Sequence, residues 1–190
     1  GLGIQTKSGR ILRDLELLKS INRKSKCVVQ MTLTTYDESL CRILEPAVST
    51  TRERVQVLKI MRDNGIPTVV WLDPILPFIN DTEDNLRGIL GYCVEAGVYG
   101  IICFGMGLTL RDGNREYFYA KLDRHFPGLR EKYHRKYGYS YEIQSDSNDK
   151  LMEIFYEECK KHDIVCNNDE IFKYLHTYED RQQPEQLSMF

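Results

Sequence analysis

The chain has 190 residues, a mass of 22.3 kDa and a formal net charge of −2. This length suffices for one domain with a substantial core, and the charge balance excludes a generally basic nucleic-acid binder, so any such contact needs a local patch. No apolar run approaches the roughly 20 residues that a membrane-spanning helix requires, and we expect no signal peptide.

The cysteines lack the close spacing of a metal or cluster site. They are Cys27, Cys41, Cys93, Cys103, Cys159 and Cys166. Cys93 and Cys103 fall inside apolar segments. We interpret all six as reduced and mostly buried thiols, which indicates a cytoplasmic protein.

The first sixty-odd residues predict alternating strands and helices. Residues 1–6 read as the end of a strand, and the stripe that follows predicts a helix to about Ile21. A second strand over 27–35 alternates apolar with polar residues, so its polar face either lines a site or meets solvent. After a loop, Thr50 and Glu53 have the spacing of a capping box, which predicts the start of a helix that ends at Gly65.

The segment that follows places an acidic residue at the end of a buried strand. Thr68 to Leu72 form an apolar run typical of a strand that is buried on both faces. Pro74 and Pro77 prevent both its continuation and an immediate helix. Asp73 therefore stands at the carboxyl end of the strand, where parallel α/β proteins bind ligands.

Beyond this loop the pattern predicts a helix from Asn80 to Gly97 and a short fourth strand over 100–104. Strands and helices in this order predict right-handed βαβ units and a parallel sheet. Four parallel strands alone do not close into a barrel, so they would leave two bare edges and one bare face. Either the sheet is open and doubly wound, or the other half of a barrel lies upstream.

The remainder predicts helices only, and with it a division into three parts. The expected helices cover 114–125, 128–137, 148–162 and 168–174. We expect a sheet unit over 1–112, a helical extension over 113–178 and a flexible, polar tail over 179–190.

Six stretches together resemble one family. They are Ile4–Ser8, Ile11–Asp14, Val29–Thr35, Leu44–Pro46, Asp73–Pro77 and Tyr117–Tyr137, the last with Asp123–Leu129. In this order they resemble the radical S-adenosylmethionine proteins related to spore photoproduct lyase, often labelled DNA repair photolyases. The likeness covers most of the chain, and the specificity lies in the combination.

The resemblance implies an α/β fold that is a partial parallel (β/α) barrel, with the later strands only, followed by an all-helical C-terminal extension. It also implies S-adenosylmethionine and a [4Fe–4S] cluster at the carboxyl ends of the strands. The family holds its cluster with a Cys-x3-Cys-x2-Cys loop, which this chain lacks. Since a cluster needs thiolates placed by such a loop, we expect the chain alone to bind neither group and to be inert. We interpret it as a fragment that lacks the N-terminal half of the barrel.

Transferred position by position, the resemblance gives a set of cofactor-binding residues. The set is Lys7, Thr32, Thr34, Asp73, Pro74 and Ile75. Lys7 would reach the methionyl carboxylate, and Thr32 would hydrogen-bond the cofactor. The turn 73–75 would lie against the adenosine. A surface lysine and threonines chosen for β propensity are the alternatives. Asp73 departs from the small apolar residue usual in the family, and Glu45 reads as a turn or cap residue.

The intact protein would generate a 5′-deoxyadenosyl radical that abstracts hydrogen from a substrate, and the family name implies a DNA-lesion repair role. The residues themselves identify no substrate. A third possibility, a fragment of an ordinary phosphate-binding barrel enzyme, is disfavoured because the βα turns lack a glycine-rich cradle.

A further hypothesis is a non-enzymatic docking module. Residues 121–136 carry six basic and two acidic side chains, with Tyr133 between them and Tyr137 directly after them. Such a helix could bind DNA, although a solvated face has the same pattern. The candidates are Arg130, Lys132, Arg135 and Lys136.

The last five residues resemble the peptide by which bacterial repair proteins dock on the sliding clamp. The candidate contacts are Gln186, Leu187, Met189 and Phe190, and a tail folded on its own core is the alternative.

Overall fold

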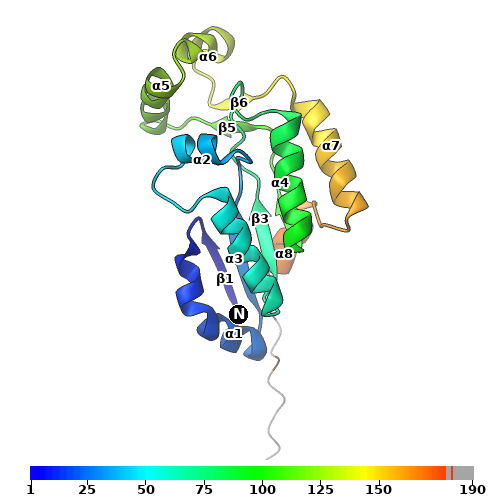
Figure 1. Cartoon of the computed structure of the whole chain (residues 1–190). Coiled ribbons are helices and arrows are strands. Elements are labelled where there is room, and N and C mark those ends of the chain that lie inside the picture. The colour runs from blue at the N-terminus through cyan, green and yellow to red at the C-terminus, as the bar shows by residue number, and fades with distance from the viewer. Residues whose placement is uncertain (179–180, 182–190) are drawn as a thin grey trace, which may run out of the picture.

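The computed structural model describes residues 1–178 and residue 181 (Figure 1). The candidate clamp-binding residues Gln186, Leu187, Met189 and Phe190 lie outside the described residues, so the docking prediction stays a prediction. Within the described ranges, no helix is long and apolar enough to cross a membrane.

The centre of the protein is a four-stranded parallel sheet in the order β1-β2-β3-β4, which confirms the predicted α/β class. The strands are β1 (Leu2–Thr6), β2 (Cys27–Thr32), β3 (Thr68–Trp71) and β4 (Gly100–Ile102). Thr6 lies opposite Met31, and Thr32 lies opposite Trp71. The carboxyl ends of these strands therefore lie side by side at one end of the sheet.

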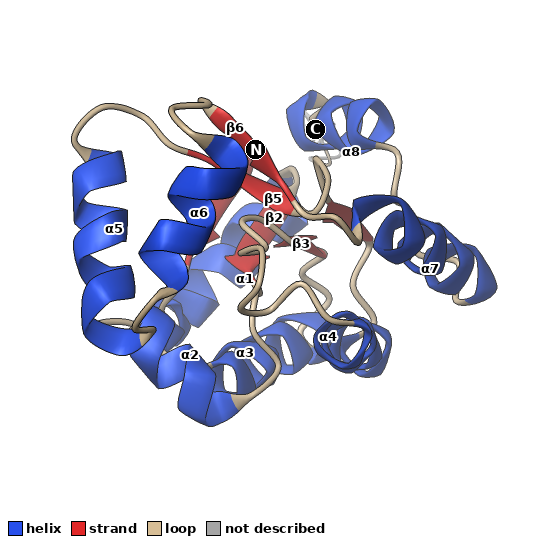
Figure 2. Ribbon diagram, turned by 90° about the horizontal axis from the view of Figure 1, so that it is seen from above, coloured by secondary structure: helices blue, strands red, loops and turns tan. Residues whose placement is uncertain are grey.

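Helices cover one face of this sheet (Figure 2). A 3-10 turn, η1 (Gly9–Asp14), leads into α1 (Leu15–Lys24), and α3 (Thr51–Asp63) and α4 (Glu83–Ala96) connect the later strands. Val29, Met31 and Val70 of the sheet join the main core with residues of these helices. The capping box is confirmed, since the Glu53 carboxylate accepts from the Thr50 amide at 2.7 Å.

The prediction of a bare second face is wrong, and of the two predicted bare edges only that of β1 is found among the described residues. Helix α8 (Asn168–His176) packs Ile171 and Leu175 onto Val28 and Val69 of the second face. At the β4 edge, the Ile101 amide donates to the Val165 carbonyl at 2.9 Å, and the Val165 amide donates to the Tyr99 carbonyl at 3.1 Å. Only β1 is left as an edge strand of this sheet in the part of the chain that the structure describes.

Two predicted boundaries also need correction. The loop after β2 contains a helix, α2 (Glu38–Leu44), which begins where the Asp37 side chain accepts from the Leu40 amide. Helix α4 begins at Glu83 under a Thr82 cap, and not at Asn80. Asn80 is instead a buried residue of the preceding loop.

The C-terminal extension is not all helical. Its helices are α5 (Asn114–His125), α6 (Leu129–Tyr137), α7 (Asn148–Lys161) and α8. Between them, β6 (Glu142–Gln144) pairs antiparallel with β5 (Gly107–Thr109). Three-residue strands are too short to show an alternating pattern, and only Ile143 marks β6 by its burial.

Candidate functional site

A cavity of about 680 Å³ lies between the carboxyl end of the sheet and the extension. Lys7, Thr34, Asp73 and Pro74 line it from the sheet side. Helix α5, strand β5 and helix α2 form the other walls. The structure thus brings four of the six predicted cofactor-binding residues to one hollow.

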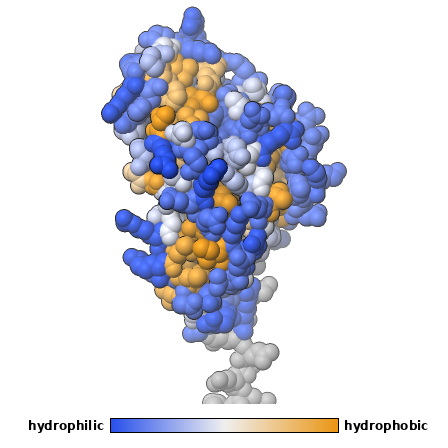
Figure 3. Space-filling view, in the orientation of Figure 1, coloured by the Kyte–Doolittle hydropathy of each residue, from blue (hydrophilic) through white to orange (hydrophobic). Residues whose placement is uncertain are grey.

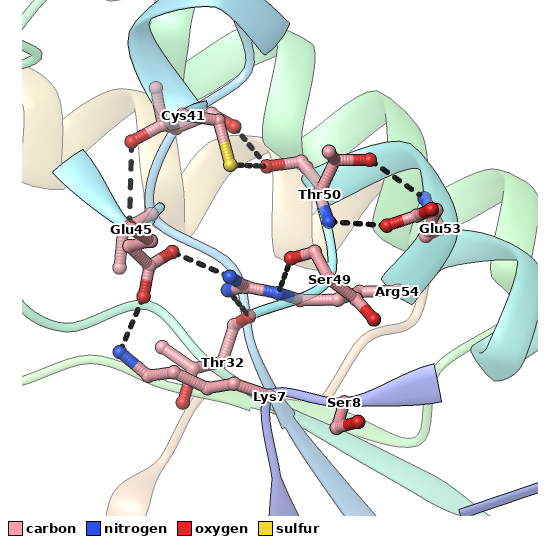
Figure 4. A network of polar contacts seen from close by, with 12 residues as sticks. Lys7, Ser8, Thr32, Cys41, Glu45, Ser49, Thr50, Glu53 and Arg54 are labelled. Atoms are coloured by element: carbon pink, nitrogen blue, oxygen red, sulfur yellow. Dashed lines mark hydrogen bonds and ion pairs between the residues drawn. The ribbon is translucent and has the colours of Figure 1, made fainter. Parts of the chain in front are cut away.

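Lys7 is held by a charge network below the cavity (Figure 4). Its ammonium pairs with Glu45 Oε1 at 2.6 Å, and Arg54 Nη2 pairs with Glu45 Oε2 at 2.8 Å. The Lys7 side chain is 40% exposed, whereas that of Arg54 is completely buried. The network therefore presents the Lys7 end to a ligand and keeps the Arg54 end inside the protein.

Arg54 ties three segments of the rim together. Its Nε donates to the Ser49 carbonyl at 2.7 Å, and its Nη1 donates to the Thr32 carbonyl at 2.9 Å. The third contact is Glu45, at the end of α2. Every donor nitrogen of this guanidinium has a partner, as a charge removed from water requires.

Thr32 and Ile75, the other two predicted residues, do not line the cavity. The Thr32 side chain is buried, and the Arg54 bond to its carbonyl anchors the end of β2. Ile75 belongs to the main core, and its amide donates to the Gly107 carbonyl at 3.1 Å. Both residues lie at the same end of the sheet as Lys7, where they support the walls of the cavity.

The polypeptide turns sharply after β3, with a cis peptide bond between Asp73 and Pro74. Asn80 closes this loop, because its side chain accepts from the Leu76 amide at 2.6 Å and donates to the Thr34 carbonyl at 2.8 Å. Asn85 also donates to Thr34, at 3.0 Å. Two buried amides thus fix the Thr34 segment against the loop that carries Asp73.

Burial raises the pKa of the Asp73 carboxyl, and the positive charge of Lys7 opposes this in part. A raised pKa means that the surroundings favour the neutral acid. The cavity floor therefore contains two groups of different character. The Lys7 ammonium is already paired with Glu45, and the Asp73 carboxyl group favours its neutral form.

The predicted DNA-binding residues of α6 have partners within the protein. Arg130 pairs with Asp123 at 2.7 Å, Lys132 lies 3.8 Å from the centre of the Phe78 ring, and Lys136 pairs with Asp146. Arg135 is exposed. None of these four residues lines the cavity. Their contacts do not test whether they bind DNA.

The cysteines do not form a metal site. In the described part of the chain, no group of three or more His, Cys, Asp or Glu residues could hold a metal ion. All six thiols are free, five are buried, and burial raises the pKa of Cys93 to about 12 and of Cys103 to about 11. Such thiols are poor ligands, so the residues present do not fit an iron–sulfur cluster.

Comparison with known proteins gives distant and longer relatives. No family model matches the chain. It is 31% identical to uncharacterized protein Rv2578c of Mycobacterium tuberculosis, over 72% of this chain and 39% of that protein. It is 28% identical to uncharacterized protein ORF301 of Acidianus two-tailed virus, over 73% of this chain and 50% of that protein.

A shorter match of 33% identity, over 43% of this chain, is to uncharacterized protein MJ0683 of Methanocaldococcus jannaschii. None of these names states an activity. The chain matches half or less of the length of these relatives.

Sequence reasoning missed Arg54 and understated Glu45. Arg54 falls at a core position of α3, and the one signal was a charged residue within the stripe that contains Val55 and Leu58. Glu45 does end α2, as predicted for a cap residue, but its side chain also joins Lys7 to Arg54.

Proposed function

We propose that this chain is the S-adenosylmethionine-binding part of a radical S-adenosylmethionine enzyme that resembles spore photoproduct lyase and acts in the repair of DNA lesions. The observation that carries the proposal is the convergence of Lys7, Thr34, Asp73 and Pro74 on one cavity at the carboxyl ends of parallel strands. The resemblance implies that the cofactor binds at the carboxyl ends of these strands.

The edge strand β1 supports a partial barrel. In the described sheet, β2 pairs with one side of β1 and no strand pairs with the other. Because a (β/α) barrel needs further parallel strands to close, the missing strands would add at β1. Relatives that are at least twice as long as the matched segment are consistent with such an addition.

Within the cavity, the Lys7 ammonium would bind the carboxylate of the cofactor, and Thr34 with Pro74 would contact the rest of the molecule. Apolar residues of β5 and α5 would exclude water from the site. When bound, the cofactor supplies the radical chemistry. The cluster that this chemistry needs would be held by residues outside this chain.

The test uses the longer protein in which the strands before β1 are present. After anaerobic reconstitution with iron and sulfide, we expect a chemical reductant to yield 5′-deoxyadenosine from S-adenosylmethionine. Lys7→Ala should weaken cofactor binding at least about tenfold, the loss expected for one charge-assisted hydrogen bond.

Lys160→Ala is the matched control, because Lys160 is an exposed lysine on α7. Thermal unfolding of each variant checks that the fold is intact. If the reconstituted protein makes no 5′-deoxyadenosine, or if Lys7→Ala binds the cofactor as the control does, the proposal is wrong.

A further inference from the structure

The wall of the cavity opposite the sheet carries cations that the proposed cofactor site does not use. Arg42 comes from α2, and Lys121 and Arg124 come from α5. The two helices lie beside each other in both views of the fold (Figures 1 and 2). Among the described residues, no carboxylate pairs with Arg42 or Arg124, and both side chains are exposed.

The positive charge of the cavity is concentrated at this wall. The acidic residues in the lining are Glu45, at the end of α2, and Asp73, after β3. Glu45 is already neutralised by Lys7 and by Arg54, and burial disfavours the charged form of Asp73. In a chain with net charge −2, the α2 and α5 wall is therefore a local site for an anion.

The identity of the cations favours phosphate. A guanidinium offers a planar fork of donors that matches phosphate oxygens, and two such groups with an ammonium can share one dianion. The ammonium of Lys121 also lies 5.2 Å from the centre of the Tyr117 ring. The Tyr117 side chain is 64% exposed and lines the same cavity, so it offers a face for a planar group.

The shape of the cavity limits the size of the ligand. Ile43, Leu108 and Phe118 supply apolar surface between the cationic wall and the sheet. Apolar side chains also gather over α5 and α6 in the space-filling view, with hydrophilic residues around them (Figure 3). A volume of about 680 Å³ lies within the range typical of small-molecule sites.

We propose that Arg42, Lys121 and Arg124 form a phosphate subsite for a phosphorylated small molecule of nucleotide size, whose planar body packs on Tyr117. The subsite adds a second ligand to the cavity and does not depend on cofactor binding at Lys7. Its test therefore separates from that of the proposed function.

The experiment titrates the full chain with uridine 5′-monophosphate by calorimetry and follows backbone amides by NMR. We expect binding with shifts at α2 and α5, and at least about tenfold weaker binding of uridine, which lacks the phosphate. Arg42→Gln and Arg124→Gln should each weaken the nucleotide about tenfold or more. Arg23→Gln, at an exposed position of α1, should leave its affinity unchanged.

Equal affinity for uridine and its monophosphate, or no effect of either arginine variant, would overturn the proposal. So would the absence of binding at millimolar concentration. If oligouridylate binds more tightly than the monophosphate and loses affinity in the same arginine variants, the ligand is a nucleic-acid strand. That result would also reject a small molecule.

Discussion

Arg54 is the residue on which the geometry of the candidate site depends. It is completely buried on α3, yet its three contacts are to the end of β2, to the loop before α3 and to Glu45 at the end of α2. Burial of this charge is tolerated because every partner is in place. The position of Lys7 at the cavity therefore depends on a residue that does not line the cavity.

We expect Arg54→Met to destabilise the protein by about 3–5 kcal/mol, because Glu45 and two carbonyl groups lose their partner. Glu45→Gln should also be costly, since it leaves the buried guanidinium without a counter-charge. The double variant should lose less stability than the sum of the losses of the two single variants, because the effects of substitutions at contacting residues are not additive. Urea unfolding of the four proteins measures this.

Arg52→Met is the control, because Arg52 is exposed on the same helix and should change stability by less than about 1 kcal/mol. Additive losses for Arg54 and Glu45 would show that the pair does not act as a unit.

Asp73 should make stability depend on pH. Its pKa is raised in the folded protein, so between the unfolded value of about 3.9 and the folded value the native state binds more protons. Stability therefore falls as pH rises through this window. Asp73→Asn resembles the neutral acid, so it should match the wild type at low pH and be more stable at neutral pH.

Urea midpoints of both proteins over a pH series check this. A constant difference between wild type and variant at every pH would mean that Asp73 ionises freely and that the loop does not disfavour its charge.

At the scale of elements, the sequence predicted what periodicity can encode. Long helices such as α5 and α7, and the apolar strand β3, were found within a few residues. Some short elements were missed, although the three-residue strand β4 was found as part of an apolar run. Helix α2 has seven residues and β6 has three, so neither repeats its pattern often enough to be recognised.

The candidate site was predictable in part for the same reason. The resemblance selected Lys7, Thr34 and Asp73. Because a parallel sheet places the carboxyl ends of its strands together, these residues could then be expected near each other. The wall formed by Arg42 and Arg124 could not, because it depends on how the extension folds back over α2.

Helix α6 shows that residues of a basic surface pattern can also have partners within the protein. Tyr133 donates to the Pro77 carbonyl at 2.6 Å, and its ring packs on Phe78, so α6 is fastened to the loop after β3. Lys132 lies over the same Phe78 ring. Some of the basic residues thus stabilise the packing of the extension, and DNA binding through them would compete with these contacts.

At the scale of the whole molecule, the open edge of β1 determines whether the sheet is part of a larger barrel. The Leu2 amide donates to the Lys26 carbonyl at 2.8 Å, toward β2. Successive residues of a strand face alternate neighbours. The amides of Gly3 and Gln5 therefore point away from β2, to the side where a further strand would pair.

We expect the amides of Gly3 and Gln5 to exchange rapidly in this chain and to be protected in the longer protein by about 100-fold or more, since pairing would remove them from solvent. Hydrogen exchange followed by NMR measures both states. The Ile4 amide, which faces β2, is the internal control and should be protected in both. Rapid exchange at Gly3 and Gln5 in the longer protein would mean that no strand adds at β1, and the partial barrel would have to be abandoned even if the cavity binds its ligands.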